Sequence, residues 1–307
     1  MNTAATEPSW LIDPAEVSAI ETFLLRRMRE HASGDHASVF AGSGFDVRGL
    51  REWEPGDGMS AIDWAQSSIN NFSPLISRQL EQDSAATVMV AADASLSTHC
   101  GPAGAQLRTT ILRCLAVLGL SAAFSQDRFG LVAFDDHGRP LGILRPRAGK
   151  AHVMHCLSLY ARCSDDRQAG SGELIPQLES HLRSSSLLVL VSDCLLAGVD
   201  ELIERFAVLT GEHDVLVVMV DARPVFAVPP VSAGWLEIYD VETGESRTVS
   251  RAAAGEMIER VDEWQHARVR HARSRGLDVV RVGAGRWELE ETLSTCFASR
   301  RLQKMRG

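Results

Sequence analysis

Residues 87–97 read Thr-Val-Met-Val-Ala-Ala-Asp-Ala-Ser-Leu-Ser, and residues 187–193 read Leu-Leu-Val-Leu-Val-Ser-Asp. Both stretches begin with a short apolar run that leads to an aspartate. Apolar runs that do not alternate with polar residues are typical of parallel strands that helices cover on both faces. The two stretches therefore predict buried strands of one sheet, each with a carboxylate at its carboxyl end.

The same kind of run recurs along the chain and alternates with longer segments. Further apolar runs occupy residues 129–134, 215–220 and 277–282, and segments with helical character lie between the runs, at 105–124, 151–160, 173–182, 199–209 and 252–274. Strands and helices in alternation favour right-handed crossovers and a parallel sheet. We therefore expect an α/β fold with a doubly wound, mainly parallel sheet.

Three stretches depart from this alternation. Residues 13–32 predict an amphipathic helix that starts at an Asp13 N-cap. Residues 33–83 are polar and rich in glycine, with short β-like pieces, whereas 235–239 and 246–250 predict a β-hairpin. We expect three parts: an N-terminal helix in 1–37, a small β-rich subdomain from 38–84 plus 222–250, and the α/β domain from 85–221 plus 251–307.

The composition narrows the classes of partner. The chain has 307 residues, 45% of them hydrophobic, and a formal net charge of -9. Nucleic acid and anionic lipid select for clustered Lys and Arg, so we expect neither as a partner. The six cysteines are dispersed without a Cys-x-x-Cys pair, which argues against a zinc knuckle or a disulfide scaffold and favours a reducing compartment. We predict a cytoplasmic protein.

The chain also lacks the pattern of a membrane segment. Its first residues show no basic region followed by an apolar core, and no apolar run reaches the roughly 18 residues of a membrane span. The apolar stretch from Ile111 to Phe124 contains Arg113. We expect this stretch to be a buried helix and the protein not to insert into a membrane.

The loop after the first core strand carries several oxygen ligands. Asp93-Ala94-Ser95-Leu96-Ser97 supplies one carboxylate and two hydroxyls, and Asp193 follows another strand. Ligands of open parallel sheets bind beyond the carboxyl ends of the strands. Oxygen donors of this kind suit hard cations. We predict a divalent-cation site at Asp93, Ser95, Ser97 and Asp193, for Mg²⁺ or, alternatively, Mn²⁺ or Ca²⁺.

Other interpretations of the strand-end residues remain open. Strand-end Asp and Ser often cap the helices that follow; we favour capping for Ser97 taken alone and a structural role for Asp135 and Asp221. A magnesium-dependent phosphohydrolase also starts from a strand-end aspartate, but it needs an acidic residue two positions later, where this chain has Ser95. The absence of a G-x-x-x-x-G-K-[ST] sequence excludes a P-loop ATPase.

Asp93, Ser95 and Ser97 match the pattern D-x-S-x-S and resemble the metal-ion-dependent adhesion site of von Willebrand factor A-type domains. Upstream, residues 42–57 read Gly-Ser-Gly-Phe-Asp-Val-Arg-Gly-Leu-Arg-Glu-Trp-Glu-Pro-Gly-Asp, and Ile62-Asp63-Trp64 follows. These segments resemble the bacterial family catalogued as domain of unknown function 58. The likeness extends from Gly42 to Gly285.

The resemblance implies a von Willebrand factor A-like fold and a non-catalytic adaptor. Members of the family are similar to adaptors that work with MoxR-type AAA+ ATPases in the assembly or activation of another protein complex. A threonine from a third loop usually completes the cation shell in such sites, but residues 170–174 read Gly-Ser-Gly-Glu-Leu, and Ser171 is the only hydroxyl there. A metal-free structural scaffold with a degenerate site is therefore the main alternative.

The signature segment combines many charged side chains with two tryptophans around the turn at residues 55–58. One interpretation is a partner-recognition surface, formed by Arg48, Arg51, Trp53, Asp57, Asp63 and Trp64. The other is that the arginines form ion pairs and the tryptophans form the small core of this layer. We favour the second interpretation for the tryptophans, Asp57 and Asp63.

Overall fold

The computed structural model describes residues 12–32, 46–54, 59, 62–69, 71–81, 85–101, 106–163, 172–182, 185–196, 198–226, 234–239 and 245–306. The chain divides into two compact units. The larger unit comprises residues 1–40 and 86–307, and the smaller unit comprises residues 41–85.

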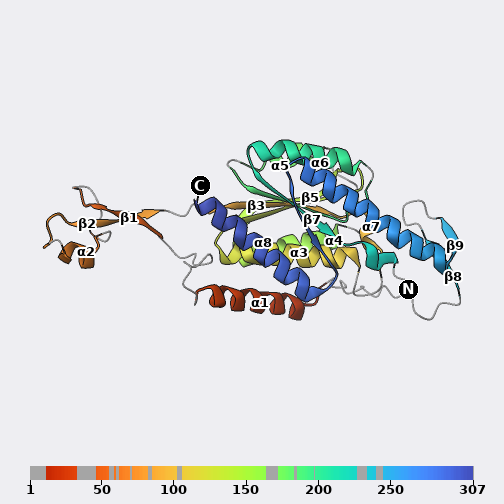
Figure 1. The fold of residues 1–307 in the computed structure, drawn as a ribbon, viewed down its shortest axis with the longest axis horizontal. Coiled ribbons are helices and arrows are strands. Elements are labelled where there is room, and N and C mark those ends of the chain that lie inside the picture. The colour runs from red at the N-terminus through yellow and green to blue at the C-terminus, as the bar shows by residue number, and fades with distance from the viewer. Residues whose placement is uncertain are drawn as a thin grey trace, which may run out of the picture. The chain divides into compact units, whose positions relative to one another are not determined.

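A sheet forms the centre of the larger unit (Figure 1). It has six strands in the order β10-β7-β6-β3-β4-β5. Its strands are β3 (Thr87–Asp93), β4 (Arg128–Phe134), β5 (Pro140–Ala148), β6 (Leu187–Ser192), β7 (Asp214–Val220) and β10 (Asp278–Val282). All neighbouring strands are parallel except β5, which is antiparallel to β4. The prediction of a mainly parallel α/β sheet is confirmed.

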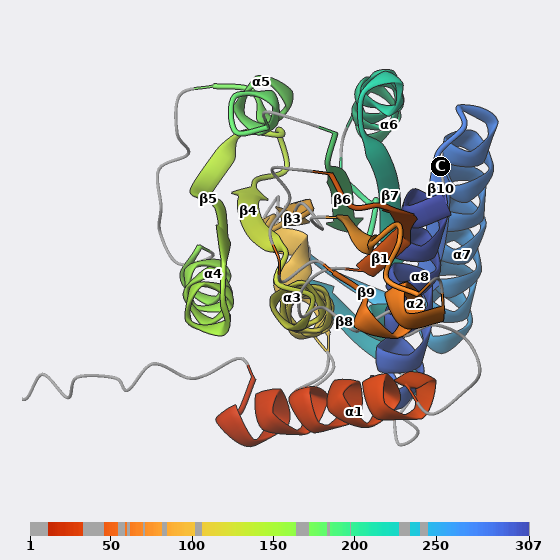
Figure 2. The same ribbon diagram turned by 90° about the vertical axis from the view of Figure 1, so that its left-hand side faces the viewer.

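Helices cover both faces of this sheet (Figure 2). One face packs against α3 (Leu107–Phe124), α4 (Lys150–Arg162) and α8 (Arg286–Arg306), and the other against α5 (Leu174–Glu179), α6 (Val199–Val208) and α7 (Arg251–Ser274). Helix α1 (Pro14–Ala32) packs on α3 and α8. In β3, Val88 and Val90 belong to the first core, whereas Met89 and Ala91 belong to the second. Burial on both faces explains why these strands are apolar without alternation.

Helix α3 is the core helix that the sequence predicts. By length and composition alone it would be able to cross a membrane, but 83% of its residues are buried inside the structure. Its partly buried Arg113 forms an ion pair with Glu16 of α1. Helix α1 begins as predicted, because the Asp13 carboxylate accepts a hydrogen bond from the Ala15 amide at 2.8 Å.

One strand and one α-helix of the larger unit were not predicted. The edge strand β5 contains Pro140 and Pro146 and is mostly half-buried, so it lacks the apolar run that marks the other strands. An edge position tolerates proline because only one side of the strand pairs. Helix α8 is too polar on average to be recognised as a core element, yet Leu289, Leu293 and Phe297 are buried along one side of it.

The predicted hairpin is present but belongs to a different unit than expected. Strands β8 (Trp235–Tyr239) and β9 (Ser246–Ser250) pair in antiparallel fashion. Strand β9 leads directly into α7, whose N-cap Ser250 accepts a hydrogen bond from the Ala253 amide at 3.2 Å. The hairpin is part of the larger unit, which corrects the prediction that 222–250 joins the small β-rich subdomain.

The smaller unit consists of β1 (Asp46–Glu52), α2 (Trp64–Ile69) and β2 (Ile76–Glu81), with β1 and β2 antiparallel. The larger unit also contains three short 3-10 helices among its described residues: η2 (Leu96–His99), η3 (Leu209–Gly211) and η4 (Arg223–Phe226).

Candidate functional site

The two predicted carboxylates follow adjacent strands at the switch point of the sheet. From β3 the chain proceeds to β4 and β5 on one side and then returns to β6 on the other side of β3. Ala92 of β3 pairs with Val191 of β6; Asp93 is the last residue of β3, and Asp193 directly follows β6. A ligand crevice forms at such a point because the chain connections that follow the two adjacent strands run in opposite directions.

The Asp93 carboxylate is fully buried and surrounded by hydroxyl donors. Its Oδ1 accepts hydrogen bonds from the Ser95 amide at 3.0 Å and the Ser95 hydroxyl at 2.6 Å. Its Oδ2 accepts one from the Ser192 hydroxyl at 2.6 Å. Among the described residues, no Lys, Arg or His forms an ion pair with Asp93.

Burial raises the pKa of Asp93, because the charged carboxylate loses contact with water. The hydrogen bonds from Ser192 and Ser95 act in the opposite direction, and the negative charge of Asp136, which follows β4, adds to the rise. The net effect is a buried acid whose charged form lacks full compensation. A cation at this position would stabilise the charged form.

The spacing of the two serine hydroxyls fits a small cation. Ser95 Oγ and Ser97 Oγ lie 3.0 Å apart. In an octahedral shell with metal–oxygen bonds of about 2.1 Å, neighbouring oxygens are about 2.9 to 3.0 Å apart. Ser97 lies inside η2, and its hydroxyl contacts Ser95. The interpretation of Ser97 as a helix cap is therefore wrong.

Asp193 lies in a tight turn that follows β6. The residue is fully buried, and its Oδ1 accepts a hydrogen bond from the Leu195 amide at 3.0 Å. The Cys194 amide donates to Ser192 Oγ at 2.9 Å. Cys194 has a φ of 59°, a left-handed conformation that is unfavourable for residues other than glycine and persists only where neighbouring contacts hold it.

Burial and the charges of Asp93 and Asp193 all raise the pKa of the Tyr160 phenol. The Tyr160 hydroxyl of α4 donates a hydrogen bond to the Asp93 main-chain oxygen at 2.6 Å. Burial raises the pKa of Tyr160 well above its usual value, and the charges of Asp93 and Asp193 add to this rise. The structure brings Asp93, Ser95 and Ser97 into direct contact, and Asp193 follows the adjacent strand β6.

Residues 49–269 match the family described as Protein of unknown function DUF58. The chain belongs to the DUF58 family. It is 25% identical over 245 residues to Uncharacterized protein Rv1480 of Mycobacterium tuberculosis (strain ATCC 25618 / H37Rv), with 78% of this chain and 74% of the relative covered. The same values hold for Uncharacterized protein Mb1516 of Mycobacterium bovis.

Two solved structures are also similar to this DUF58 chain. The conserved hypothetical protein BatB from Bacteroides thetaiotaomicron has 15% identity and a TM-score of 0.41, with 72% of this chain and 98% of that chain covered. An aerotolerance-related membrane protein from Bacteroides fragilis has 13% identity and a TM-score of 0.42, with 68% and 99% covered.

The other strand-end aspartates of the DUF58 chain have structural partners, as predicted. Asp135 accepts hydrogen bonds from the amides of His137 at 3.0 Å and Arg139 at 2.8 Å, and it also pairs with the Arg139 side chain. Asp221 pairs with Arg223 at 2.6 Å and with an arginine of β10 at 3.2 Å. The predicted third-loop ligand Ser171 lies outside the described residues.

Several side chains that donate hydrogen bonds to the residues of the site were not predicted from the sequence. Ser192 stands directly before Asp193, so a hydroxyl next to a strand-end carboxylate was an available local signal. Tyr160, Trp264 and Gln265 come from helices far away in the sequence, and no local pattern indicates that they reach the ends of β3, β6 and β7. Only the tertiary packing reveals their contacts.

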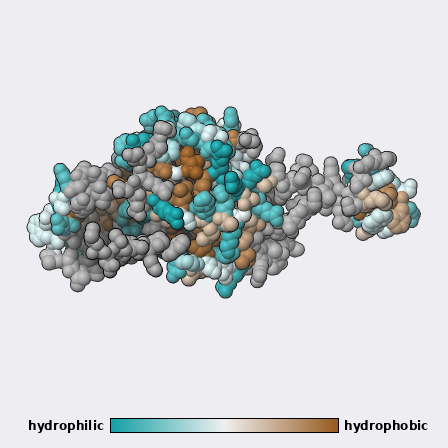
Figure 3. Space-filling view, turned by 180° about the vertical axis from the view of Figure 1, so that it is seen from behind, coloured by the Kyte–Doolittle hydropathy of each residue, from teal (hydrophilic) through white to brown (hydrophobic). Residues whose placement is uncertain are grey.

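In the smaller unit, the predicted partner-binding residues have different surroundings. Asp63 caps α2, because its Oδ1 accepts hydrogen bonds from the Ala65 and Gln66 amides, each at 3.1 Å. Trp53 is half-buried, whereas Trp64 is 55% exposed, so the assignment of Trp64 to a small core is wrong. The space-filling view shows apolar surface on this unit (Figure 3).

The remaining predicted residues of this surface are described only in part. The Arg51 guanidinium donates a hydrogen bond to the Glu52 main-chain oxygen at 3.0 Å. Arg48 lies in β1, but its side chain is outside the described part of the chain, and Asp57 is outside it altogether.

Proposed function

We propose that this DUF58 protein is a non-catalytic, protein-binding adaptor whose α/β domain is von Willebrand factor A-like and binds a divalent cation, with Mg²⁺ as the first choice. The ligands are Asp93, Ser95, Ser97 and Asp193. One observation carries the proposal: two hydroxyls 3.0 Å apart lie beside a buried carboxylate that forms no ion pair with the described residues. Ser171 is the proposed ligand from the third loop.

The electrostatics of the site support a cation there. Buried carboxylates are costly unless a positive charge or a full set of hydrogen bonds compensates them. Asp93 and Asp193 are both fully buried at adjacent strand ends. A bound Mg²⁺ would supply the missing positive charge and retain an open coordination position. An acidic side chain of a partner protein would fit that position.

Membership of the DUF58 family supports the choice of partner. By resemblance, we propose that the protein works in the cytoplasm with a MoxR-type AAA+ ATPase on a client protein complex. The surface formed by Arg48, Arg51, Trp53, Asp57, Asp63 and Trp64 is the proposed second contact, and the exposed Trp64 ring supports it. Tryptophan is enriched among the interface residues that contribute most to binding.

Titration calorimetry with Mg²⁺ and Mn²⁺ tests the cation site. The parent protein should release or absorb heat above buffer dilution, and Asp93→Ala should abolish that signal. Asp135→Asn is the matched control, because Asp135 is also a strand-end aspartate but pairs with Arg139; it should bind as the parent does. An absence of heat in the parent would favour the metal-free scaffold, in which the buried carboxylates only organise the loops.

A capture experiment tests the partner. An immobilised parent protein should retain the MoxR-type ATPase in Mg²⁺ and lose it in EDTA, and Asp93→Ala should fail to retain it in either buffer. Equal capture in Mg²⁺ and EDTA would reject metal-dependent binding. Trp64→Ala tests the second contact and should weaken capture without changing the cation titration.

A further inference from the structure

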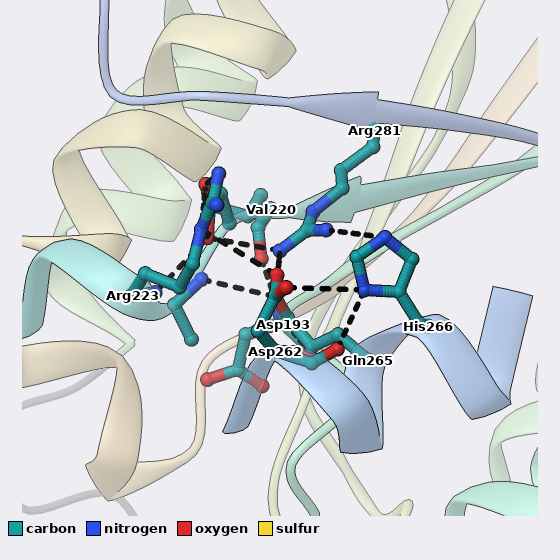
Figure 4. Close-up of polar contacts among 9 residues, drawn as sticks. Asp193, Val220, Arg223, Asp262, Gln265, His266 and Arg281 are labelled. Carbon is teal, nitrogen blue, oxygen red and sulfur yellow. Dashed lines mark hydrogen bonds and ion pairs between the residues drawn. The ribbon is translucent and has the colours of Figure 1, made fainter. Parts of the chain in front are cut away.

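Gln265 of α7 joins the ends of two central strands. The side chain is fully buried. Its amide nitrogen donates one hydrogen bond to the Asp193 main-chain oxygen at 2.8 Å and another to the Val220 main-chain oxygen at 2.9 Å (Figure 4). One amide group therefore connects the turn after β6 with the end of β7.

The orientation of this amide is fixed from its other side. The Gln265 side-chain oxygen accepts a hydrogen bond from Arg281 of β10 at 3.0 Å and a longer one from the Ala222 amide at 3.4 Å. Arg281 is held in turn by Asp262 at 2.7 Å and Asp221 at 3.2 Å. A flipped amide would place its oxygen against two carbonyl oxygens, which buried polar groups avoid.

The neighbouring residue of α7 holds the next carbonyl of the same turn. The Trp264 indole donates a hydrogen bond to the Cys194 main-chain oxygen at 3.0 Å, and the Arg268 guanidinium lies 4.0 Å from the centre of the indole ring. Consecutive residues of α7 thus bind consecutive carbonyls of a turn whose central residue has a φ of 59°. Such a conformation requires support from its surroundings.

We propose that Gln265, with Trp264, is the positioning residue of the cation site: α7 holds the turn so that the Asp193 carboxylate faces Asp93. The cation part of this inference rests on the proposed function. The main-chain oxygen that Gln265 binds and the carboxylate that would bind the ion belong to the same residue. A displacement of about 1 Å in a side chain that ligates the ion is enough to weaken binding at a site.

Hydrogen exchange in metal-free protein tests the positioning. Gln265→Met removes both donor bonds at nearly constant volume, and exchange of the Cys194 and Leu195 amides should accelerate by about tenfold. Arg260→Gln is the control on the same helix: it removes an exposed ion pair with Glu256 and leaves the contacts of Gln265 with Asp193, Val220 and Arg281 in place. Exchange of these two amides in the control should stay within about twofold of the parent.

Mn²⁺ titration of the same proteins tests the consequence for the site. Gln265→Met should bind Mn²⁺ about tenfold more weakly than the parent, whereas Arg260→Gln should bind as the parent does. Trp264→Phe removes the indole donor from a side chain that is 43% exposed, and it provides the same measurements if Gln265→Met does not fold. Its effect on exchange and affinity should be smaller, about threefold.

The outcomes separate this inference from the proposed function. Unchanged amide exchange in Gln265→Met and Trp264→Phe would overturn the inference, even where the parent binds Mn²⁺. Faster exchange with unaltered Mn²⁺ affinity would also overturn it, because the turn would then not position the ligand. A parent protein that binds no Mn²⁺ would overturn the proposed function together with the cation role of Gln265.

Discussion

Replacement of Ser192 by alanine should destabilise the metal-free protein more than the loss of one small hydroxyl suggests. The Ser192 hydroxyl donates to Asp93 Oδ2 at 2.6 Å and accepts from the Cys194 amide at 2.9 Å. It therefore connects the end of β3 with the turn after β6. Ser192→Ala removes both contacts at once, in a position that is fully buried.

The expected magnitude follows from these two contacts. A hydrogen bond to a charged group contributes about 1.5 to 3 kcal/mol, and a buried amide left without an acceptor costs about 1 to 3 kcal/mol. The two effects share one hydroxyl and partly overlap, so we expect a loss of about 2 to 4 kcal/mol in the free energy of unfolding. The same change removes a hydrogen bond that lowers the pKa of Asp93, so the pKa should rise further.

Urea denaturation followed by circular dichroism at pH 8 in EDTA measures this loss. Ser294→Ala is the matched control, since Ser294 is also buried but its hydroxyl donates only to the Glu291 main-chain oxygen of its own helix at 3.1 Å. That control should stay within about 0.5 kcal/mol of the parent. A loss below about 0.5 kcal/mol in Ser192→Ala would refute the bridging role.

Three further results are expected. An added Cβ at helical Gly119 would lie 2.6 Å from a buried valine, but at Gly255 nothing lies within 4 Å; Gly119→Ala should lower the unfolding free energy by about 1 to 3 kcal/mol, and Gly255→Ala should raise it by about 0.5 to 1 kcal/mol. Ser121→Ala should raise the thermal midpoint, because this buried hydroxyl has no hydrogen-bond partner among the described residues. Burial acts to raise the pKa of Asp221, but neighbouring arginines lower it overall. Its stabilisation is therefore present above its unfolded-state pKa and is lost as the pH falls through the lower folded-state pKa. Arg281→Met should reduce that acid-dependent loss in urea titrations between about pH 5 and pH 2; an unchanged pH profile would contradict the pairing.

The strands of the central sheet were predictable because each depends on a local pattern. Runs such as 87–93 and 187–192 are apolar throughout, since helices cover both faces of the strands. The edge strand β5 was missed because pairing on one side with β4 does not require such a run. Its proline residues and exposed arginines fit an edge position but also resemble a loop.

Of the candidate site, only the proposed ligand residues were predictable from the sequence. The spacing of Asp93, Ser95 and Ser97 places them in one loop, and the alternation of strands and helices brings Asp193 to the same edge of the sheet. The capping interpretation of Ser97 failed because the chain turns into η2 directly after Ser95. The sequence contains no separate signal for that turn.

The sequence by itself determined the parallel α/β sheet and the carboxylate and hydroxyl groups at its strand ends, because apolar periodicity and ligand spacing are properties of neighbouring residues. Only the tertiary structure decided which distant side chains hold those groups. Tyr160 reaches Asp93, and Gln265 reaches Asp193 from 72 positions away along the chain. Such contacts depend on how α4 and α7 pack against the sheet, and packing is a property of the whole fold.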